Sequence, residues 1–365
     1  MRSIFIVLGC TILLVVYVCW RLWRIVPMGW PLKLSVVVLF ILWMGMAFAS
    51  IGFTERMPMG IATLFCKIGP LWLIAFLYLF ITFLLADIAT LCRILPKGYL
   101  NSNAVGLLTI VGIVAILMIA GHIHYNHKYR KELTITTNKP LERPLKILLA
   151  SDLHLGYTIG RQELAKWIEQ IIAEEPDLVL LCGDIIDRSL RPLIAGGYDE
   201  EFRRLKMPLY AVPGNHEYFD NFEAARSFLE GAGIRLLRDE SLFYKDICII
   251  GRNDKSSHKG KSKRKSVAEL AGNTNGAFTI LLDHQPYSLE AAEQAGIDFQ
   301  FSGHTHRGQV WPISWVTDAM YEKSWGHLVR GSTHYYITSG LGIWGPKIRL
   351  GSRSEYLILH IKPSE

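Results

Sequence analysis

The sequence predicts an all-α transmembrane region of four helices followed by a domain with a layered α/β or α+β sheet. Two observations support this division. Half of the 365 residues are hydrophobic, and the apolar excess lies before about residue 125. After that point, short apolar runs alternate with amphipathic helical patterns, which is typical of a sheet covered by helices.

Four uncharged apolar stretches have roughly the 20 residues that a helix needs to cross a bilayer. They are residues 4–20, 34–53, 68–86 and 104–121, within a transmembrane region 1–125. The first is followed by RLWR and not by a small-residue cleavage site, so we expect a retained helix and no signal peptide. We therefore expect a multi-pass protein of the cell membrane. Basic residues near the helix ends conflict, so they leave open the side on which the C-terminal domain lies.

Residues 126–144 are polar and contain proline, which indicates a linker or a first edge strand. The domain proper is expected over residues 145–365. One amphipathic helix is expected from residue 161, with Leu164, Trp167, Ile168, Ile171 and Ile172 on one face, and another over 222–229. Apolar runs predict strands at 145–151, 178–184, 209–217, 247–252, 278–286, 298–304, 335–340 and 355–361.

Polar side chains follow five of these strands. In open α/β sheets, ligand sites form outside the carboxyl ends of the strands. Carboxylate, amide and imidazole groups suit divalent ions such as Mn, Fe or Zn. Because the set is too large for one ion, it predicts two divalent metal ions sharing a bridging carboxylate. The candidate ligands are Asp152, His154, Asp184, Asn215, His284, His304 and His306.

The same residues form motifs that resemble a known family. Asp152-x-His154, Gly183-Asp184-x-x-Asp187, Gly214-Asn215-His216-Glu217, His284 and Gly303-His304-Thr305-His306 occur in the order seen in the calcineurin-like metallophosphoesterase superfamily. The resemblance covers about residues 143–361. The apolar leader is similar to that of a membrane-anchored branch, which includes bacterial phosphodiesterases and the family called transmembrane protein with metallophosphoesterase domain. Residues 339–355 are similar to the closing segment of that branch.

The resemblance implies a two-sheet β-sandwich flanked by helices, and a role for each motif residue. Asp184 would bridge the two metals, and His216 would contact phosphate and protonate the leaving oxygen. Asp187 would either orient ligands or pack locally. One metal would be held by Asp152, His154 and His306, and the other by Asn215, His284 and His304.

Arg307 departs from the glycine that often follows this motif in the membrane-anchored branch. Arginine at this position also occurs in hydrolases that cleave UDP-diacylglucosamine. Arg307 could therefore bind a second phosphate, or it could be a solvated loop residue. The membrane anchor favours a phosphodiester or pyrophosphate substrate linked to a lipid, such as a phospholipid, UDP-diacylglucosamine or a polyprenyl phosphate, with membrane lipids as partners.

Two other classes of function stay open. The domain could be a non-catalytic binding scaffold at the membrane, although this chain keeps every ligand and the proton donor. The membrane region could act as a sensor or transporter, for which Asp87, just past the third stretch, is the acid to test. The basic residues 255–265 indicate a solvated loop or a segment attracted to anionic lipid. They lack interleaved aromatic residues, so we do not expect nucleic-acid binding.

Overall fold

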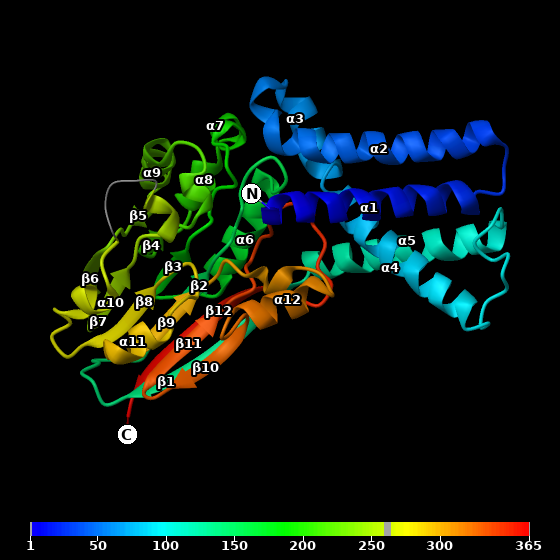
Figure 1. Cartoon of the computed structure of the whole chain (residues 1–365). Helices are drawn as coiled ribbons and strands as arrows, with labels where there is room; N and C mark the ends of the chain where they lie inside the picture. Colours follow the sequence, from blue (N-terminus) through cyan, green and yellow to red (C-terminus); the bar gives the residue numbers. More distant parts are fainter. Residues whose placement is uncertain (1, 259–263, 365) are drawn as a thin grey trace. The chain divides into compact units, whose positions relative to one another are not determined.

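The computed structural model describes residues 2–258 and 264–364. It forms two compact units, which divide after Ile123 (Figure 1). The first unit is helical. The second contains two sheets and carries all of the expected metal ligands. Residues 259–263 of the expected basic segment lie outside the described residues.

Within the part of the chain that the structure describes, three helical stretches are long and apolar enough to cross a membrane: Trp30–Gly52, Met59–Leu91 and Ala104–Asn126. The second of them consists of two consecutive helices, and the third extends into the second unit by its last three residues. The expected count of four is not confirmed. Residues 4–20 belong to a helix, α1, but α1 is not among these three. The helices of the helical unit are α1 (Arg2–Ile25), α2 (Trp30–Gly52), η1 (Thr54–Arg56), α3 (Met59–Ile68), α4 (Leu71–Leu91) and α5 (Ala104–Asn126).

The sequence placed Asp87 just past the third apolar stretch, whereas in the structure it lies inside α4. Its carboxylate forms an ion pair with Arg21 of α1 and accepts a hydrogen bond from the hydroxyl of Tyr17 over 2.5 Å. These partners on α1 satisfy the carboxylate, so an acid can lie within the apolar helix α4. A paired acid of this kind is consistent with helix packing.

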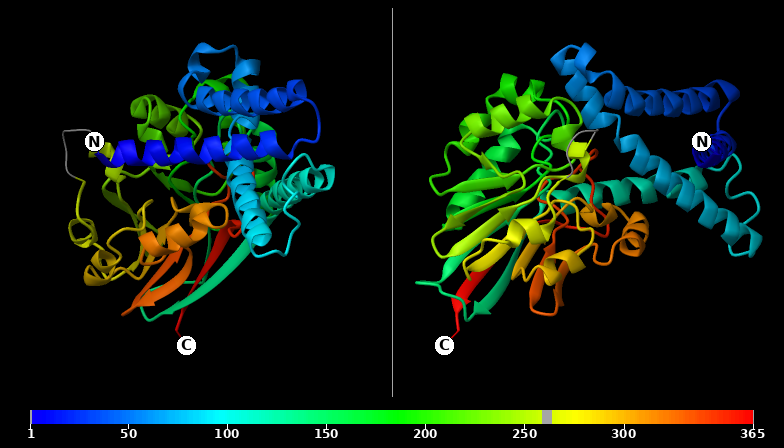
Figure 2. Two further views of the ribbon diagram at one scale, coloured as in Figure 1. Left: turned by 45° about the vertical axis from the view of Figure 1, so that its right-hand side comes forward. Right: turned by 60° about the vertical axis from the view of Figure 1, so that its left-hand side comes forward.

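The second unit consists of two six-stranded sheets, with strand orders β1-β12-β2-β3-β4-β5 and β10-β11-β9-β8-β7-β6 (Figure 2). Both sheets mix parallel and antiparallel pairs. The strands are β1 (Lys128–Thr137), β2 (Leu145–Ala150), β3 (Leu178–Cys182), β4 (Leu209–Val212), β5 (Arg235–Leu236), β6 (Glu240–Tyr244), β7 (Ile247–Gly251), β8 (Phe278–Leu282), β9 (Phe299–Ser302), β10 (Gly326–Arg330), β11 (Thr333–Ile337) and β12 (Ser354–Pro363).

The helices of this unit cover the outer faces of the two sheets. Residues of α6, α8 and α9 pack in one buried cluster with β2, β3 and β4, and residues of α10 and α11 pack with β7 and β8. The remaining bounds are α6 (Arg161–Ala173), α7 (Arg191–Gly196), α8 (Tyr198–Phe202), η2 (His216–Tyr218), α9 (Phe222–Gly231), η3 (Lys255–His258), α10 (Val267–Ala271), α11 (Glu290–Gln294), η4 (His306–Gly308) and α12 (Ile313–Met320).

A third buried cluster joins the inner faces of the sheets. Ile147 and Leu149 of β2 pack in it with Ile280 of β8 and Phe301 of β9. Central strands are apolar on both faces because a sheet or helices cover each side; every residue of β3 is buried, for example. Removing this much apolar surface from water is the main source of stability for the sandwich.

Residues 128–137 resolve the two alternatives for the segment after α5. They form β1, which pairs in parallel with β12 at the edge of the first sheet. The edge-strand alternative therefore describes them. One detail of the expected α6 face is wrong: Ile172 is 39% exposed, whereas Leu164, Trp167, Ile168 and Ile171 are buried.

Candidate metal centre

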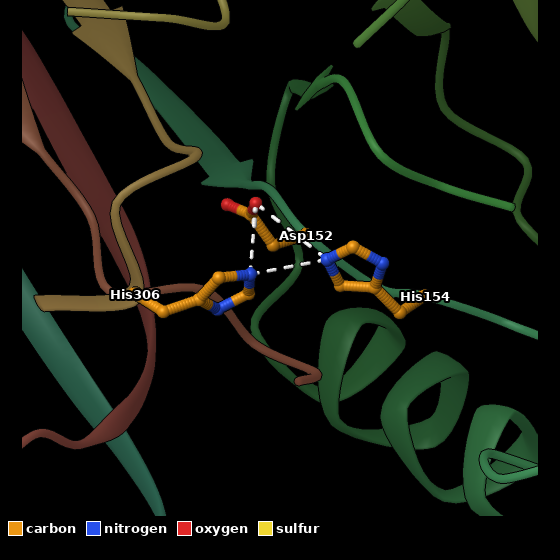
Figure 3. Close-up of side chains that lie close together, drawn as sticks. All are labelled: Asp152, His154 and His306. Atoms are coloured by element: carbon orange, nitrogen blue, oxygen red, sulfur yellow. Dashed lines mark hydrogen bonds and ion pairs between the residues drawn. The ribbon is translucent and has the colours of Figure 1, made fainter. Parts of the chain in front are cut away.

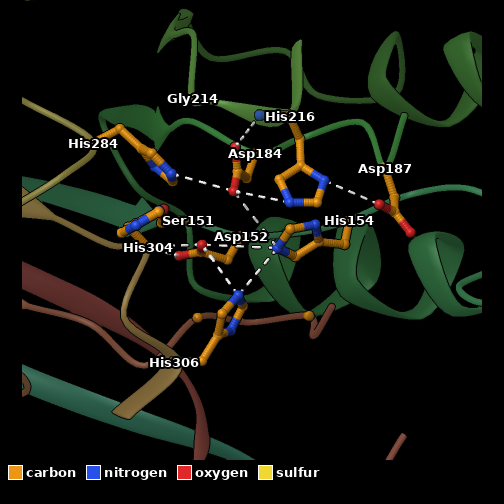
Figure 4. Close-up of polar contacts among 12 residues, drawn as sticks. Ser151, Asp152, His154, Asp184, Asp187, Gly214, His216, His284, His304 and His306 are labelled. Atoms are coloured by element: carbon orange, nitrogen blue, oxygen red, sulfur yellow. Dashed lines mark hydrogen bonds and ion pairs between the residues drawn. The ribbon is translucent and has the colours of Figure 1, made fainter. Parts of the chain in front are cut away.

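The expected ligands lie at the carboxyl ends of five strands. Parallel strands β2, β3 and β4 are neighbours in one sheet, and β8 and β9 are neighbours in the other. The segments that follow them meet between the two sheets (Figure 4). The structure thus brings together side chains that are up to 154 positions apart in sequence, from Asp152 to His306.

A first group consists of Asp152, His154 and His306 (Figure 3). The Nε2 atoms of the two histidines are 3.1 Å apart, and Nε2 of His306 is 3.5 Å from Oδ1 of Asp152. His154 Nε2 lies 3.8 Å from the same oxygen. Three ligand atoms therefore converge on one point, as a first metal ion requires.

A second group consists of Asp184, His284 and His304. His284 Nε2 lies 3.2 Å from Asp184 Oδ2. The same carboxylate oxygen is 3.8 Å from His154 Nε2, a member of the first group. Asp184 therefore lies between the two groups, in the position that a bridging carboxylate would take.

Two buried polar atoms test whether this site fits metal ions. Among the described residues, Oδ1 of Asn215 and Nε2 of His284 are buried and make no contact with hydrogen-bond geometry, although Nε2 of His284 lies 3.2 Å from the Asp184 carboxylate. A buried polar atom without a partner costs free energy, about 1–3 kcal/mol. His284 Nδ1 is engaged with the carbonyl of Cys182 at 2.7 Å, which leaves Nε2 to face the second group. Divalent cations would satisfy both atoms, so the donor set fits a two-metal centre.

The backbone of the site is strained at the ligands themselves. Asp152, His154 and Asp184 have φ of 56°, 46° and 51°, and His304 and His306 have φ of 70° and 46°. Residues with a Cβ rarely adopt these angles, which cost of order 1–3 kcal/mol each and cluster at functional sites. These left-handed turns follow the ends of the strands and carry the ligand side chains toward one another.

The electrostatics are those of carboxylates and imidazoles buried together. Burial, together with the neighbouring Asp184 carboxylate, raises the pKa of Asp152 to about 6. Burial also opposes ionisation of Asp184, but the imidazoles of His284 and His216 outweigh it and hold the pKa of Asp184 well below its usual range. Burial lowers the pKa of His304 to about 4, so its imidazole is neutral and available as a ligand at neutral pH.

Comparison with known proteins agrees with this geometry. Residues 145–308 match the family described as calcineurin-like phosphoesterase. An uncharacterized metallophosphoesterase of Aquifex aeolicus is 30% identical over 259 residues, which cover 68% of this chain and 98% of the relative. The chain belongs to the calcineurin-like metallophosphoesterase family. The resemblance inferred from the motifs is confirmed.

Two further relatives match a smaller share of this chain. An uncharacterized metallophosphoesterase of Helicobacter pylori is 29% identical over 245 residues, or 64% of each chain. A zebrafish (Danio rerio) protein named transmembrane protein with metallophosphoesterase domain is 30% identical over 234 residues, 60% of this chain and 53% of that protein. The chain thus spans less than two thirds of the length of these two relatives. Such relatives and the three apolar helices indicate a membrane protein.

Glu217 is a residue beside the candidate metal centre for which the sequence predicts no role. One carboxylate oxygen accepts from the backbone N–H of Asp184 (3.0 Å) and Gly214 (2.7 Å), and the other from Ile185 (2.8 Å) and Ile186 (2.9 Å). Glu217 therefore fixes the backbone that carries Asp184. Its place in the Gly214-Asn215-His216-Glu217 motif was the available signal.

Arg349 is a second residue without an expected role. It is fully buried, and its guanidinium donates to the carbonyl oxygens of Ser339 at 2.6 Å and Gly342 at 2.7 Å. These bonds fold the closing segment, residues 339–355, against the first ligand group. There the amides of Leu341 and Gly342 donate to the carbonyls of Ser151 and Asp152. The similarity of residues 339–355 to a family's closing segment predicts that segment, but no pattern in it predicts a buried arginine.

Three polar features lie beside the ligand groups and not within them. The guanidinium of Arg307 lies 3.8 Å from Asp318 and 4.8 Å from the ring of Trp325. Asp283, next to His284, pairs with Arg252 and Arg264 at 2.8 and 3.0 Å. Arg264, near the far end of the expected basic segment, thereby contacts the edge of the candidate metal centre.

Proposed function

We propose that this protein is a membrane-anchored phosphoesterase that uses two divalent metal ions. The position of Asp184 Oδ2, within 4 Å of ligand nitrogens from both groups, is the observation that carries the proposal. Asp152, His154 and His306 would hold one ion, Asn215, His284 and His304 the other, and Asp184 both. The oxygen and imidazole donors suit Mn, Fe or Zn.

When bound, two such ions would polarise the phosphate ester and activate water for in-line attack on phosphorus. His216 is the proposed proton donor. Its Nε2 lies 3.9 Å from Asp184 Oδ2, at the edge of both groups, while Nδ1 is engaged by Asp187. Burial opposes protonation, but the carboxylates of Asp184 and Asp187 raise the pKa of His216 above its usual value. A protonated His216 can therefore give its proton to the leaving oxygen.

The proposed substrate is a phosphodiester or pyrophosphate joined to an apolar group, such as a phospholipid or UDP-diacylglucosamine. Two partly exposed aromatic rings support it: the Phe219 ring lies 4.4 Å from that of His216, and the Trp344 ring lies 6.5 Å from it. Rings beside the proton donor can contact an acyl or polyprenyl chain. Arg307 would have to leave Asp318 to bind a second phosphate of this substrate.

We also propose the organisation in which this enzyme works. Residues 1–125 form a multi-pass anchor in the cell membrane, with α1 as a fourth membrane helix beside the three found by length and composition. Residues 126–144, which include the edge strand β1, join the anchor to the rest of a catalytic domain over 145–365. The anchor keeps the catalytic domain next to substrates that stay in the bilayer.

The test uses the full chain in detergent, stripped of metal and then given Mn²⁺. Hydrolysis of bis-p-nitrophenyl phosphate and p-nitrophenyl phosphate would be followed for the wild type, Asp184→Asn and His216→Ala. We expect metal-dependent turnover that Asp184→Asn abolishes and His216→Ala lowers by about 10²–10⁴-fold. The matched control is His327→Ala, an exposed histidine that pairs with His334 on β11.

The outcome separates the two classes of function. Turnover by wild type and control, but not by the site variants, would establish a metal-dependent phosphoesterase, and the faster substrate would show the ester preference. A folded chain that binds two metal ions but hydrolyses neither these esters nor a phospholipid would contradict the proposal and favour a binding scaffold.

A further inference from the structure

Helix α12 has its polar and apolar faces reversed with respect to a helix packed on a soluble domain. Its buried residues are Ser314 and Thr317, which are 5% and 8% exposed. Its apolar side chains point outward: the exposed fractions are 42% for Ile313, 64% for Trp315, 54% for Val316 and 67% for Met320. Trp311, just before the helix, is 40% exposed and packs edge-on against Trp315. We call Trp311, Ile313, Trp315, Val316 and Met320 the α12 patch.

The α12 patch belongs to the turn that follows the metal ligands. Only Arg307–Val310 separate His306 from Trp311. Ser314 faces inward, donating its backbone N–H to the carbonyl of Val310, and the hydroxyl of Thr317 bonds to the carbonyl of Ile313. Two of the polar residues of α12, Ser314 and Thr317, are thus buried within the domain. The third, Asp318, is exposed and pairs with Arg307, and the apolar residues face outward.

Hydrogen bonds within the second unit place the α12 patch beside the end of α5, a candidate membrane helix. The backbone N–H of Trp311 donates to the carbonyl of Leu350 over 2.6 Å, and Val310 forms a β-bridge to Leu350. The preceding carbonyl, of Arg349, contacts the imidazole of His124, near the C-terminal end of α5, at 3.3 Å. A single residue, His127, separates the end of α5 from the start of β1. Within the second unit, the segment Arg349–Leu350 therefore links the start of the α12 patch to His124, in the last turn of α5.

We propose that the α12 patch inserts into the interfacial layer of a phospholipid bilayer. The bilayer is the occupant that the connectivity favours, because the helix that ends next to the patch is one that can cross it. Tryptophan is enriched where apolar surface meets lipid head groups, and a helix with one apolar face lies in that layer. Docking there holds the segment that carries His304 and His306 at the membrane surface. The proposal does not depend on catalysis.

The test uses the full chain reconstituted into vesicles of equal parts phosphatidylcholine and phosphatidylglycerol, with or without bromine on the acyl chains. Bromine quenches tryptophan only at contact. The difference in emission between wild type and W311F/W315F isolates the two tryptophans of the α12 patch from the other eight of the 10 in the chain. We expect brominated lipid to lower this difference emission about twofold or more, and aqueous acrylamide to lower it little. Trp167→Phe is the control, since Trp167 is only 2% exposed on α6.

Two other outcomes of the quenching experiment would contradict the proposal. Quenching by acrylamide but not by bromine would show that the α12 patch lies in water. Quenching by neither would show that protein covers it, either a second copy or the helices of the same chain. Because both substituted side chains are exposed, the variant is expected to fold, and its thermal unfolding midpoint would confirm this. All of these readouts are independent of hydrolysis, so an inactive protein would still give an answer.

Discussion

His216 donates its Nδ1–H to Oδ1 of Asp187 over 3.0 Å. Since an ionised carboxylate can only accept, this bond fixes the tautomer and the orientation of the imidazole. Nε2 is then turned toward Asp184 and the ligand groups. The two expected roles for Asp187, orienting ligands and local packing, both stay predictions; the bond adds a contact with His216, the proposed proton donor. We expect Asp187 to act through His216, as a positioning residue.

Asp187→Asn should lower kcat about 10–100-fold and leave KM and metal content nearly unchanged. The amide of asparagine still fills the space, but because it can both donate and accept, it no longer fixes the His216 tautomer that carries its proton on Nδ1. Steady-state kinetics with bis-p-nitrophenyl phosphate and metal analysis of the purified variant would measure this. A control is Asp199→Asn, on α8, where Asp199 pairs with Arg203 at the surface. Loss of bound metal in Asp187→Asn would instead assign Asp187 to the ligand set.

Glu217→Gln should destabilise the second unit. Each carboxylate oxygen of Glu217 accepts from two backbone N–H groups. In glutamine, the NH₂ group replaces one of these oxygens, so two backbone N–H groups would face a donor and lose their acceptor. Two or more buried bonds would be lost, at a cost of about 2–4 kcal/mol. Thermal unfolding of the metal-free chain would show a lower midpoint. The matched control, Glu223→Gln, changes an exposed glutamate of α9 and should cost less than about 0.5 kcal/mol. Equal midpoints for the two variants would refute the positioning role.

Much of the metal centre could be predicted from the sequence because its residues follow apolar strands. Strands are short and regular, so a polar residue after each run marks the sheet edge where ligands meet. Glu217 and Arg349 were not predicted as supports, since their partners are backbone amides and carbonyls. No side-chain pattern records such partners.

The helical unit was harder to predict, because hydropathy measures the composition of a segment and does not show which charged side chains form ion pairs between helices. Asp87 ended the third expected stretch, yet it lies within α4 opposite Arg21. The outward-facing α12 patch was missed for a related reason. Eight residues are too few for a membrane stretch, and which face is buried depends on tertiary contacts.

Asp87→Asn should weaken the packing of α1 on α4. The variant leaves Arg21 without its counter-charge in a partly buried position, which should cost about 1–3 kcal/mol. Thermal unfolding in detergent would measure the loss, with Glu55→Gln, an exposed acid between α2 and α3, as the control. The double variant Arg21→Met/Asp87→Asn should recover part of it, because it removes both charges. The single variant Arg21→Met completes the cycle. If the loss in the double variant equals the sum of the losses in the two single variants, the pair is not coupled.

Lys128 should make the stability of the chain depend on alkaline pH. Its side chain is 5% exposed and lies 3.7 Å from Glu163, at the start of β1. Burial, reinforced by the cations of Arg349 and Lys347 and opposed by Glu163, lowers the pKa of Lys128 to about 7. Between that value and the pKa of about 10.4 in the unfolded chain, the unfolded state binds more protons than the folded state. The free energy of unfolding should therefore rise with pH in this window.

Lys128→Met tests this linkage, since methionine fills the space without titrating. From pH 7 to pH 9 the wild type should gain about 2 kcal/mol relative to Lys128→Met. Thermal unfolding midpoints across this range would give the difference. Lys166→Met, an exposed lysine of α6, should follow the wild type at every pH. If wild type and Lys128→Met instead change in parallel, the amine is charged in the folded state, and the ion pair with Glu163 outweighs burial.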